Sequence, residues 1–321
     1  MRQLSGTLVA ATFGLVVLTL PAGAQTDVTE RFSHTAHLES SGSLDLSNVT
    51  GNIVVTAGAG QDVVIDAIKR VQRPNPRAAQ ALLQMIEIQV VEQANRVEVR
   101  TVVPRPRNFP GSVDYTVSVP ADASVTVKTF SGNVRVSNVG GELRAETTSG
   151  NLVVAGARKL EALKCISGDI DIIDGAADDV VTASTVSGGI TVRGLKARDI
   201  ELTSVTGHIR LEDADSERIL AKAVNGNVDY SGELAKNGRY EFVSHSGDLT
   251  LVLSGSTGFE LRANSFNGTV RSDFAISRRA AARGEGVGAV RTPRAIRGAF
   301  GDASAMLVVR AFSGNISITR R

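Results

Sequence analysis

The sequence predicts an all-β protein built as a parallel β-solenoid with about 19 residues per coil, and three observations support this prediction. A Ser-Gly-Asn triplet or a close variant recurs along most of the chain. Short runs of alternating apolar residues flank each triplet, which is the pattern of strands with one buried face. The chain has 32 glycines, no tryptophan and only 4% aromatic residues. A narrow column filled by Val, Ile, Leu and Ala would have this composition.

The repeat is most clearly read from its glycines. Successive repeat glycines are 18, 18, 20, 19, 19, 21 and 21 residues apart. The last interval is 46 residues, so one coil there carries an insertion or the interval is spread over two coils. A two-stranded unit of this length cannot bury its apolar face alone, whereas stacked units pair each strand with its equivalent in the next coil. We expect right-handed coils, because crossover connections between parallel strands are generally right-handed. The repeat glycines are Gly132, Gly150, Gly168, Gly188, Gly207, Gly226, Gly247, Gly268 and Gly314.

Each triplet is predicted to be a corner between two strands. Glycine permits the positive φ that a tight corner needs, and the Asn or Asp after it tolerates turn geometry and bonds the local backbone. A row of small residues, from Thr129 to Ala311, lies two positions before the triplets and suits a tapered corner. A sandwich or a propeller is the alternative fold, but propeller blades need about 40 residues each.

Residues 1–24 are predicted to be a signal peptide. Arg2 supplies the positive charge, Leu8 to Leu20 form the apolar segment, and Ala22-Gly23-Ala24 is a small-x-small cleavage site. The apolar segment is shorter than the roughly 20 residues that span a bilayer, and no later segment is apolar enough to do so. We therefore expect a mature chain that begins at Gln25 and is exported, to a periplasm, the cell surface or the exterior.

Residues 25–120 are predicted to cap the N-terminal end of the solenoid, which occupies residues 121–321. One outlying copy of the triplet, at Gly51, forms a coil in the same phase. A short helix is expected near residues 76–86, because a proline stands in its first turn. Solenoids need such caps because their ends are open sheet edges. The expected strands of the cap are residues 63–67, 88–91, 97–103 and 113–119.

The segment after the cap resembles a known family. A strand ends at Pro120 in Val-Ser-Val-Pro, and Val125-x-Val127 then precedes recurring Ser-Gly-Asn-Val, Gly-Gly-Glu-Leu and Thr-Ser-Gly-Asn-Leu motifs. These motifs resemble the bacterial putative-adhesin family of unknown function, the DUF4097-type β-helical proteins, over roughly residues 40–320. The resemblance implies an exported or cell-envelope protein, and the family supplies no catalytic residues to carry over.

One stretch departs from the repeat between Gly268 and Gly314. Residues 276–298 are predicted to be a mobile Arg-rich loop with a single acid, Glu285, in a chain whose net charge is only +2. Such a cluster either contacts an anionic polymer or lipid, or is a solvated insertion. The near-neutral chain as a whole gives no specific signal for nucleic acid. The arginines of the loop are Arg278, Arg279, Arg283, Arg291, Arg294 and Arg297.

No catalytic, cofactor-binding or metal-binding site is predicted. The densest acidic group reads as solvated corner charges rather than as the clustered carboxylates of a polysaccharide lyase or hydrolase. This group comprises Asp169, Asp171, Asp174, Asp178 and Asp179.

The histidines and the single cysteine give weak signals. His34 and His37 have a spacing that could serve a metal ion, but a flexible N-terminal tail is the preferred interpretation. His208 and His245 lie two coils apart, about 10 Å, which is too far to share an ion. Cys165 falls in the row of small residues and is expected to be a buried, inert thiol. A single cysteine excludes an intramolecular disulfide and a cysteine-rich zinc site.

The sequence therefore predicts a non-catalytic, adhesin-like binding or structural protein that presents one solenoid face to an envelope or surface component. The alternative is a β-helical carbohydrate-active enzyme, which would bring three or more carboxylates together in a cleft. End-to-end polymerisation through the last coil, Ser313 to Thr319, is a lesser possibility that Arg320 and Arg321 would discourage.

Overall fold

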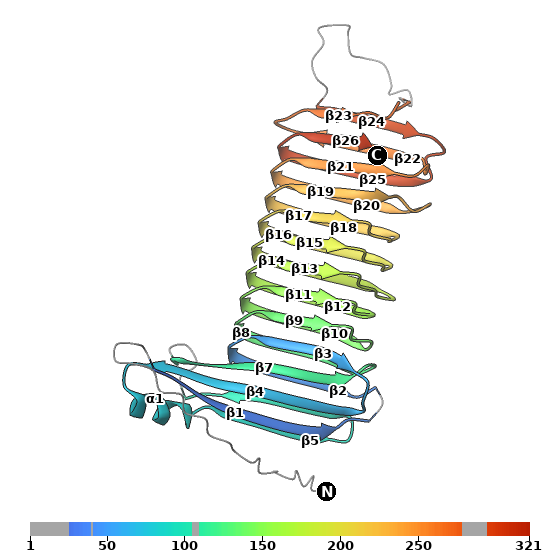
Figure 1. Cartoon of the computed structure of the whole chain (residues 1–321). Coiled ribbons are helices and arrows are strands. Elements are labelled where there is room, and N and C mark those ends of the chain that lie inside the picture. Colours follow the sequence, from blue (N-terminus) through green and yellow to red (C-terminus); the bar gives the residue numbers. More distant parts are fainter. Residues whose placement is uncertain (1–25, 40, 105–108, 278–293) are drawn as a thin grey trace, which may run out of the picture. The chain divides into compact units, whose positions relative to one another are not determined.

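A computed structural model describes residues 26–39, 41–104, 109–277 and 294–321 (Figure 1). The described chain is almost entirely β-structure, with parallel strands in two long sheets, so the predicted fold class is confirmed. The residues form two compact units, 1–160 (unit 1) and 161–321 (unit 2). The predicted signal peptide lies outside the described residues.

Unit 1 begins with an antiparallel sheet. β1 (Thr26–His37) pairs with β4 (Asp62–Arg73), and β4 pairs in turn with β7 (Gly111–Pro120). The inward side chains of β4 alternate strictly with outward ones, and Val63, Ile65 and others of the inward row are fully buried. The expected strands at residues 63–67 and 113–119 are thereby confirmed.

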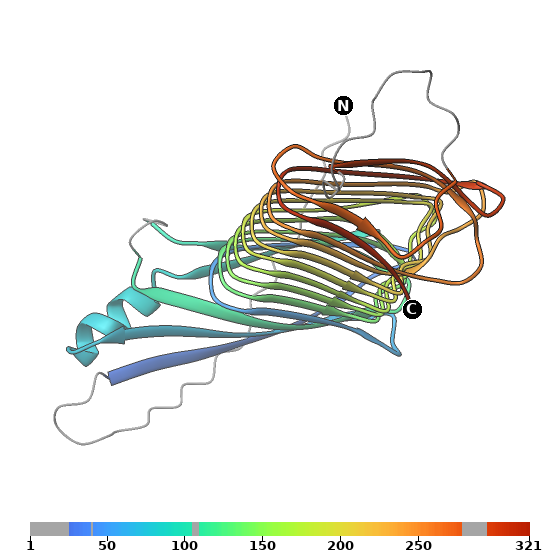
Figure 2. The same ribbon diagram turned by 90° about the horizontal axis from the view of Figure 1, so that it is seen from above.

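One short helix packs on this sheet. α1 (Pro76–Leu83) lies against β1 and β4 (Figure 2), with Ala79 and Leu83 buried. Asn75 is the N-cap, since its Oδ1 accepts hydrogen bonds from the backbone N–H groups of Arg77 and Ala78. The predicted helix is therefore present, although it ends three residues early. Among the described residues, no helix is long and apolar enough to cross a membrane.

The first coils of the repeat also belong to unit 1. β2 (Ser43–Thr50) and β3 (Ile53–Gly58) meet at Gly51, and they pair in parallel with β8 (Ser124–Ser131) and β9 (Val134–Ser137), respectively. The coil predicted around Gly51 is thus confirmed, in register with the repeat. The remaining strands of unit 1 are β5 (Glu87–Gln93), β6 (Arg96–Val102), β10 (Glu142–Ser149) and β11 (Leu152–Ala155).

Unit 2 is a stack of coils, each with one longer and one shorter strand. The longer strands are β12 (Lys159–Ser167), β14 (Val180–Ser187), β16 (Asp199–Thr206), β18 (Arg218–Asn225), β20 (Arg239–Ser246), β22 (Phe259–Ser265) and β25 (Ala305–Ser313). The shorter strands are β13 (Ile170–Ile173), β15 (Ile190–Arg193), β17 (Ile209–Glu212), β19 (Val228–Glu233), β21 (Leu249–Ser254), β23 (Val270–Ser272) and β26 (Ile316–Arg320).

Equivalent positions of neighbouring coils lie directly opposite each other. Ile190 pairs with Ile209, and Ile209 pairs with Val228, so that apolar side chains form continuous inward rows. The longer strands stack in the order β12-β14-β16-β18-β20-β25-β22, and the shorter ones in the order β13-β15-β17-β19-β21-β26-β23. The coils have the length that the glycine spacing predicts.

The order of the coils departs from the order of the chain at the C-terminal end. β25 pairs with both β20 and β22, and β26 pairs with both β21 and β23. The last coil in sequence is therefore inserted between the two coils that precede it (Figure 1). Gly268 and Gly314 stand at the corners of neighbouring coils, so the 46-residue interval is one coil step that carries an insertion. The hypothesis of polymerisation through this last coil is wrong, because the coil already has a neighbour on each side.

A second cap closes the outer edge of β22. β24 (Ala295–Phe300) pairs antiparallel with β22, so a strand begins inside the segment 276–298 that the sequence predicted to be a loop. Phe259, Phe274 and Phe300 pack together with ring centroids 4.9–5.5 Å apart. The exposed edge that a solenoid would otherwise present is thus covered, as solenoid ends require.

Candidate functional site

The corner side chains link each coil of unit 2 to the next. The Oδ1 atoms of Asp169 and Asn227 accept hydrogen bonds from the backbone N–H groups of Gly189 (2.7 Å) and Asp248 (2.9 Å) one coil further on. His208 accepts through Nδ1 from Asn227 N–H at 3.0 Å, which places its ring proton on Nε2. The expectation of local backbone bonding at these corners is corrected: in each of these cases the bond runs between coils.

The row of small residues makes a second set of bonds between coils. The hydroxyls of Thr185 and Ser204 each donate to the carbonyl of a repeat glycine in the preceding coil, at 3.0 Å. Ser244 does the same at 2.9 Å, and Ser265 donates at 2.7 Å to Gly314 in the last coil of the chain, which is stacked beside its own. Cys165 occupies the same row and is buried, and burial raises the pKa of its thiol above the ordinary value. A neutral buried thiol fits the inert role predicted for it.

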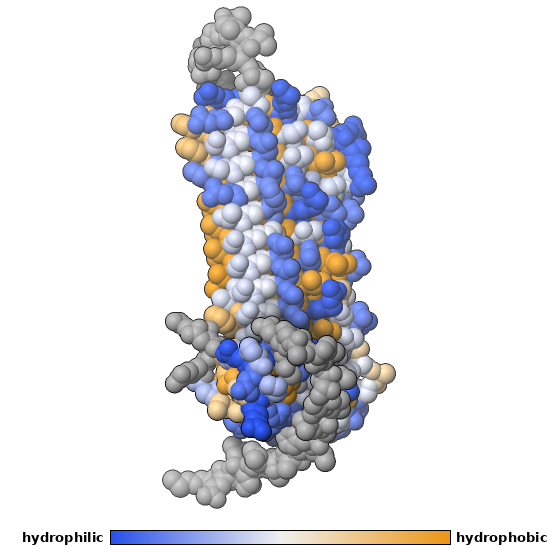
Figure 3. Space-filling view, turned by 60° about the vertical axis from the view of Figure 1, so that its left-hand side comes forward, coloured by the Kyte–Doolittle hydropathy of each residue, from blue (hydrophilic) through white to orange (hydrophobic). Residues whose placement is uncertain are grey.

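Directly before the Ser-Gly corners, unit 2 exposes a row of apolar side chains with one member in each coil, which we call the apolar ladder. Their exposed fractions run from 39% for Val205 to 60% for Phe266, and only His245 among them is not an aliphatic or phenyl group. In Figure 3 an orange column stands at the left-hand edge of the middle coils, beside a white column, and toward the top of the stack the same edge turns blue and pale. The ladder comprises Ile166, Val186, Val205, Val224, His245, Phe312 and Phe266.

The aromatic end of the ladder is a continuous stack. The rings of His245 and Phe312 lie 4.7 Å apart at 7°, and those of Phe312 and Phe266 lie 5.0 Å apart at 8°. These spacings match the separation of neighbouring strands, so the stacking follows from the register of the coils. A shallow groove of about 510 Å³ runs beside the stack and is bordered by Lys222 and Arg310.

The rows on either side of the ladder lack acidic residues. The outward row two positions before the ladder is Lys164, Ser184, Thr203, Lys222, Val243, Arg310 and Asn264. The corner row directly after it is Ser167, Ser187, Thr206, Asn225, Ser246, Ser313 and Asn267. The ladder is therefore an apolar ridge with a basic border on one side and an uncharged border on the other.

The ladder is not among the features predicted above from the sequence, although the sequence contains a pattern that indicates it. The residue before each Ser-Gly corner follows a buried position in a strand of alternating pattern, so a polar side chain is expected there. Apolar residues stand there in phase in most coils instead. Phe130 of unit 1 occupies the equivalent position and is also half exposed.

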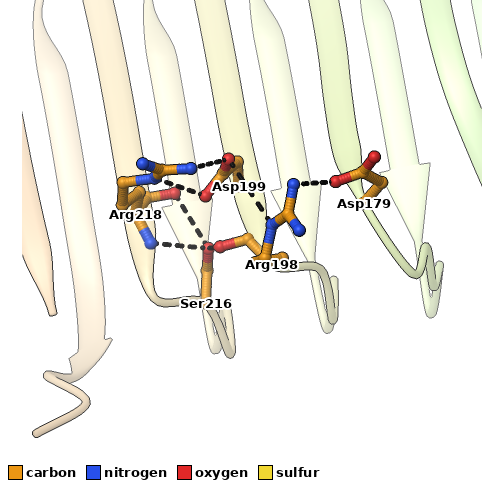
Figure 4. A network of polar contacts seen from close by, with 5 residues as sticks. All are labelled: Asp179, Arg198, Asp199, Ser216 and Arg218. Atoms are coloured by element: carbon orange, nitrogen blue, oxygen red, sulfur yellow. Dashed lines mark hydrogen bonds and ion pairs between the residues drawn. The ribbon is translucent and has the colours of Figure 1, made fainter.

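A polar network occupies the opposite end of the longer strands. Arg218 binds both oxygens of the buried Asp199 carboxylate, and Arg198 contacts both Asp199 and Asp179 (Figure 4). The hydroxyl of Ser216 lies 2.9 and 2.8 Å from the backbone carbonyls of Arg198 and Arg218. The hydrogen bonds and charge of Arg218 lower the pKa of Asp199 below its ordinary value. This network fastens three successive coils to one another.

The variant Asp199→Asn is expected to be less stable than the natural chain, by an amount that depends on pH. Because the pKa of Asp199 is lower in the folded than in the unfolded state, its carboxylate contributes stability that is fully present above about pH 5. That contribution is lost as the pH falls through the folded-state pKa. Urea midpoints of both proteins should differ at pH 7, and the difference should narrow as the pH is lowered below the ordinary pKa of an aspartate. Asp179→Asn, at an exposed ion pair, serves as the control with little effect at either pH.

The structure places the predicted loop arginines only in part. Arg278, Arg279, Arg283 and Arg291 lie outside the described residues. Arg297 is exposed in β24 opposite Arg262, and the carbonyl of Arg294 accepts a hydrogen bond from Ser265 N–H at 2.8 Å, next to Phe266 of the ladder.

The predicted N-terminal tail is wrong, because His34 and His37 lie in β1. His34 Nε2 is 2.6 Å from a carboxylate oxygen of Glu92, and His37 Nδ1 is 3.0 Å from one of Asp62. Across the residues that the structure describes, no three His, Cys, Asp or Glu side chains are grouped so that they could hold a metal ion.

The acidic residues of unit 2 bear on the alternative of a carbohydrate-active enzyme. Asp213, Asp215 and Glu233 line a shallow hollow of about 600 Å³ together with Lys236. Asp215 is ion-paired with Lys196 at 3.2 Å. Of the acidic group at residues 169–179, Asp169 is engaged with a backbone N–H and Asp179 with Arg198.

The model of the family described as Toastrack DUF4097 matches residues 114–319, and no curated protein matches this sequence. The fold is similar to that of a putative adhesin from Bacteroides fragilis NCTC 9343, at 14% identity and a TM-score of 0.42 over 89% of this chain and 96% of that chain. It is also similar to a putative cell adhesion protein from Clostridium sporogenes ATCC 15579, at 11% identity and a TM-score of 0.24 over 90% and 99% of the two chains. A putative lipid binding protein from Parabacteroides distasonis ATCC 8503 has 11% identity and a TM-score of 0.32 over 70% and 93%.

Proposed function

The chain belongs to the Toastrack DUF4097 family, and from this premise we propose that it is an exported, non-catalytic binding protein of the cell envelope or surface. The apolar ladder of unit 2 is its binding face. The observation that carries this proposal is a run of seven neighbouring side chains, all but one apolar, that a folded unit leaves exposed in phase.

Exposed apolar surface of this extent is unusual in a chain that acts alone. Scattered apolar side chains on a surface need no explanation, but a contiguous row of them marks an interaction site. The ladder side chains are not needed to fill the core, because the inward rows of each coil are already complete and buried. The ladder therefore has a role outside the fold.

The Arg-rich segment is a second part of the proposal. Its six arginines would add attraction toward an anionic envelope component. One of them, Arg294, accepts a hydrogen bond through its carbonyl from the N–H of Ser265, the residue before Phe266 of the ladder. The ladder supplies apolar contact, and the arginines supply electrostatic attraction, which salt weakens. Measurements at low and high salt therefore separate the two contributions.

Retention of envelope components by the mature chain, from Gln25 onward, tests the proposal. We expect envelope lipids or polysaccharides to be retained by the natural chain and lost when Val186, Val205 and Val224 are changed to threonine. Replacement of Arg278, Arg279, Arg283 and Arg291 by glutamine, which leaves β24 intact, is expected to weaken retention at low salt only. Retention that is unchanged in the threonine variant would contradict the binding face. Cleavage of a retained polysaccharide that disappears in Asp213→Asn would contradict the non-catalytic role.

A further inference from the structure

We propose that the apolar ladder of unit 2 lies on an anionic lipid bilayer, with its side chains in the interface between headgroups and acyl chains. Lys164, Lys222 and Arg310 face the headgroups beside it. This inference rests on the proposed function and names the partner of the same face.

The shape of the ladder fits a flat partner. Each coil contributes one rung at the strand separation of about 4.8 Å, so seven rungs span about 29 Å in a straight line. The rungs stand directly before the corner of every coil, along the left-hand outline of the stack in Figure 3. A small ligand in the groove beside the aromatic stack would contact only some of the rungs, whereas an apolar phase covers all seven at once.

The aromatic rungs argue against a glycan as the partner. His245, Phe312 and Phe266 are stacked face to face, so the faces of Phe312 are already occupied by its neighbours. Sugar rings pack on exposed aromatic faces, but here the edges of the rings point outward. Ring edges and the methyl groups of Val186, Val205 and Val224 form a surface suited to acyl chains.

The charges beside the ladder favour anionic headgroups. Lys164 and Lys222 have no ion-pair partner among the described residues, and Arg310 is paired with Glu241 at 2.8 Å. No acidic residue stands in either row that borders the ladder. Basic side chains next to an interfacial apolar face are attracted to anionic lipids, and this attraction weakens with salt.

The absence of tryptophan from the chain makes a direct test possible. Phe312→Trp places a single tryptophan in the ladder, and Val91→Trp places one at an exposed apolar site of β5 in unit 1. With vesicles of equimolar phosphatidylcholine and phosphatidylglycerol, the emission of Phe312→Trp should shift to the blue and be quenched by lipids brominated on the acyl chains. The emission of Val91→Trp should not change. Equal responses of the two probes, or no response of either, would overturn the proposal.

Vesicle sedimentation with matched variants supplies the quantitative test. A ladder variant with Val186→Thr, Val205→Thr, Val224→Thr and Phe312→Ser is expected to bind at least tenfold more weakly than the natural chain. Threonine keeps the preference for strands at these exposed sites, and circular dichroism verifies the fold. The control variant, Val91→Thr with Met85→Gln, removes comparably exposed apolar groups and should bind normally. Equal binding of the ladder variant would overturn the proposal.

The outcomes separate this inference from the proposed function. Ladder-dependent retention of envelope polysaccharide without binding to vesicles would refute the lipid partner and leave the binding face intact. Vesicle binding that is lost only when Arg278, Arg279, Arg283 and Arg291 are replaced by glutamine would refute the role of the ladder. Displacement of the protein from vesicles by soluble dextran sulfate, with no shift of the Phe312→Trp emission, would identify an anionic polymer as the partner instead.

Discussion

Ending the chain after Ser304 is expected to unfold the C-terminal coils of unit 2. The deletion removes β25 and β26, whose five large apolar side chains are buried. At about 1.5–3 kcal/mol each, these side chains represent roughly 8–15 kcal/mol of burial, which is comparable to the entire stability of a domain. They are Leu307, Val308, Val309, Ile316 and Ile318. Thermal unfolding should show a large loss of stability, and hydrogen exchange should show loss of protection in β20 to β23.

The matched control for this deletion is a chain that ends after Thr319 and loses only two exposed arginines. It should unfold almost as the full chain does. In the chain that ends after Ser304, protection of β22 and β23 at the level of the full chain would contradict the insertion of the last coil. Those strands would then have a pairing partner other than β25 and β26.

Cysteine pairs test the same insertion without a deletion. Residues 241 and 308 lie opposite each other on β20 and β25, and residues 308 and 262 lie opposite each other on β25 and β22. Glu241→Cys with Val308→Cys should therefore form a disulfide. Glu241→Cys with Arg262→Cys should not, since two strand separations, about 9.6 Å, exceed the reach of a disulfide. The opposite result would show that the coils stack in chain order.

Replacing Gly207 by alanine is expected to lower the free energy of unfolding by about 3 kcal/mol or more. Gly207 has a φ of 146°, and a Cβ atom there would lie 2.0 Å from the carbonyl oxygen of Gly188. The obstacle is backbone of the neighbouring coil, so no flexible side chain can move aside. Backbone strain and overpacking each cost about 1–3 kcal/mol. In a unit of this size the melting temperature should fall by about 6–12 °C.

The control is Gly60→Ala, where the nearest heavy atom to the new Cβ lies at 3.8 Å and the backbone is not in the left-handed region. This change should leave the melting temperature almost unaltered. An equally small effect of Gly207→Ala would mean that the corners of unit 2 are not stacked as closely as described.

The corners were predictable because their requirements are local. A repeat glycine with positive φ and a polar residue after it can be read from the chain, and seven of the nine repeat glycines have φ between 133° and 156°. The direction of the corner bonds was not predictable. Asp169 Oδ1 could reach its own turn or the next coil, and only the stacking of the coils decides between these partners.

The stacking order of the last coils could not be predicted from the sequence, for a different reason. Equivalent coils have the same register, so Tyr240 can lie opposite either Leu261 or Leu307 with similar burial of apolar surface, and the structure selects Leu307. The 46-residue interval is compatible with both orders. The ladder was not predicted from the sequence either. Each of its side chains is a single exposed apolar residue in the chain, and these residues form a continuous face only when the coils are stacked.

Carbene footprinting of the natural protein on phosphatidylglycerol-containing vesicles measures directly whether the apolar ladder lies on the bilayer. We expect reduced labelling of the peptides that carry Ile166, Val186, Val205, Val224 and Phe312 when vesicles are present. Labelling of Met85 and Val91, which are similarly exposed in the free protein, should stay the same. Unchanged labelling of the ladder on vesicles to which the protein is bound would contradict the claim that this face meets the membrane.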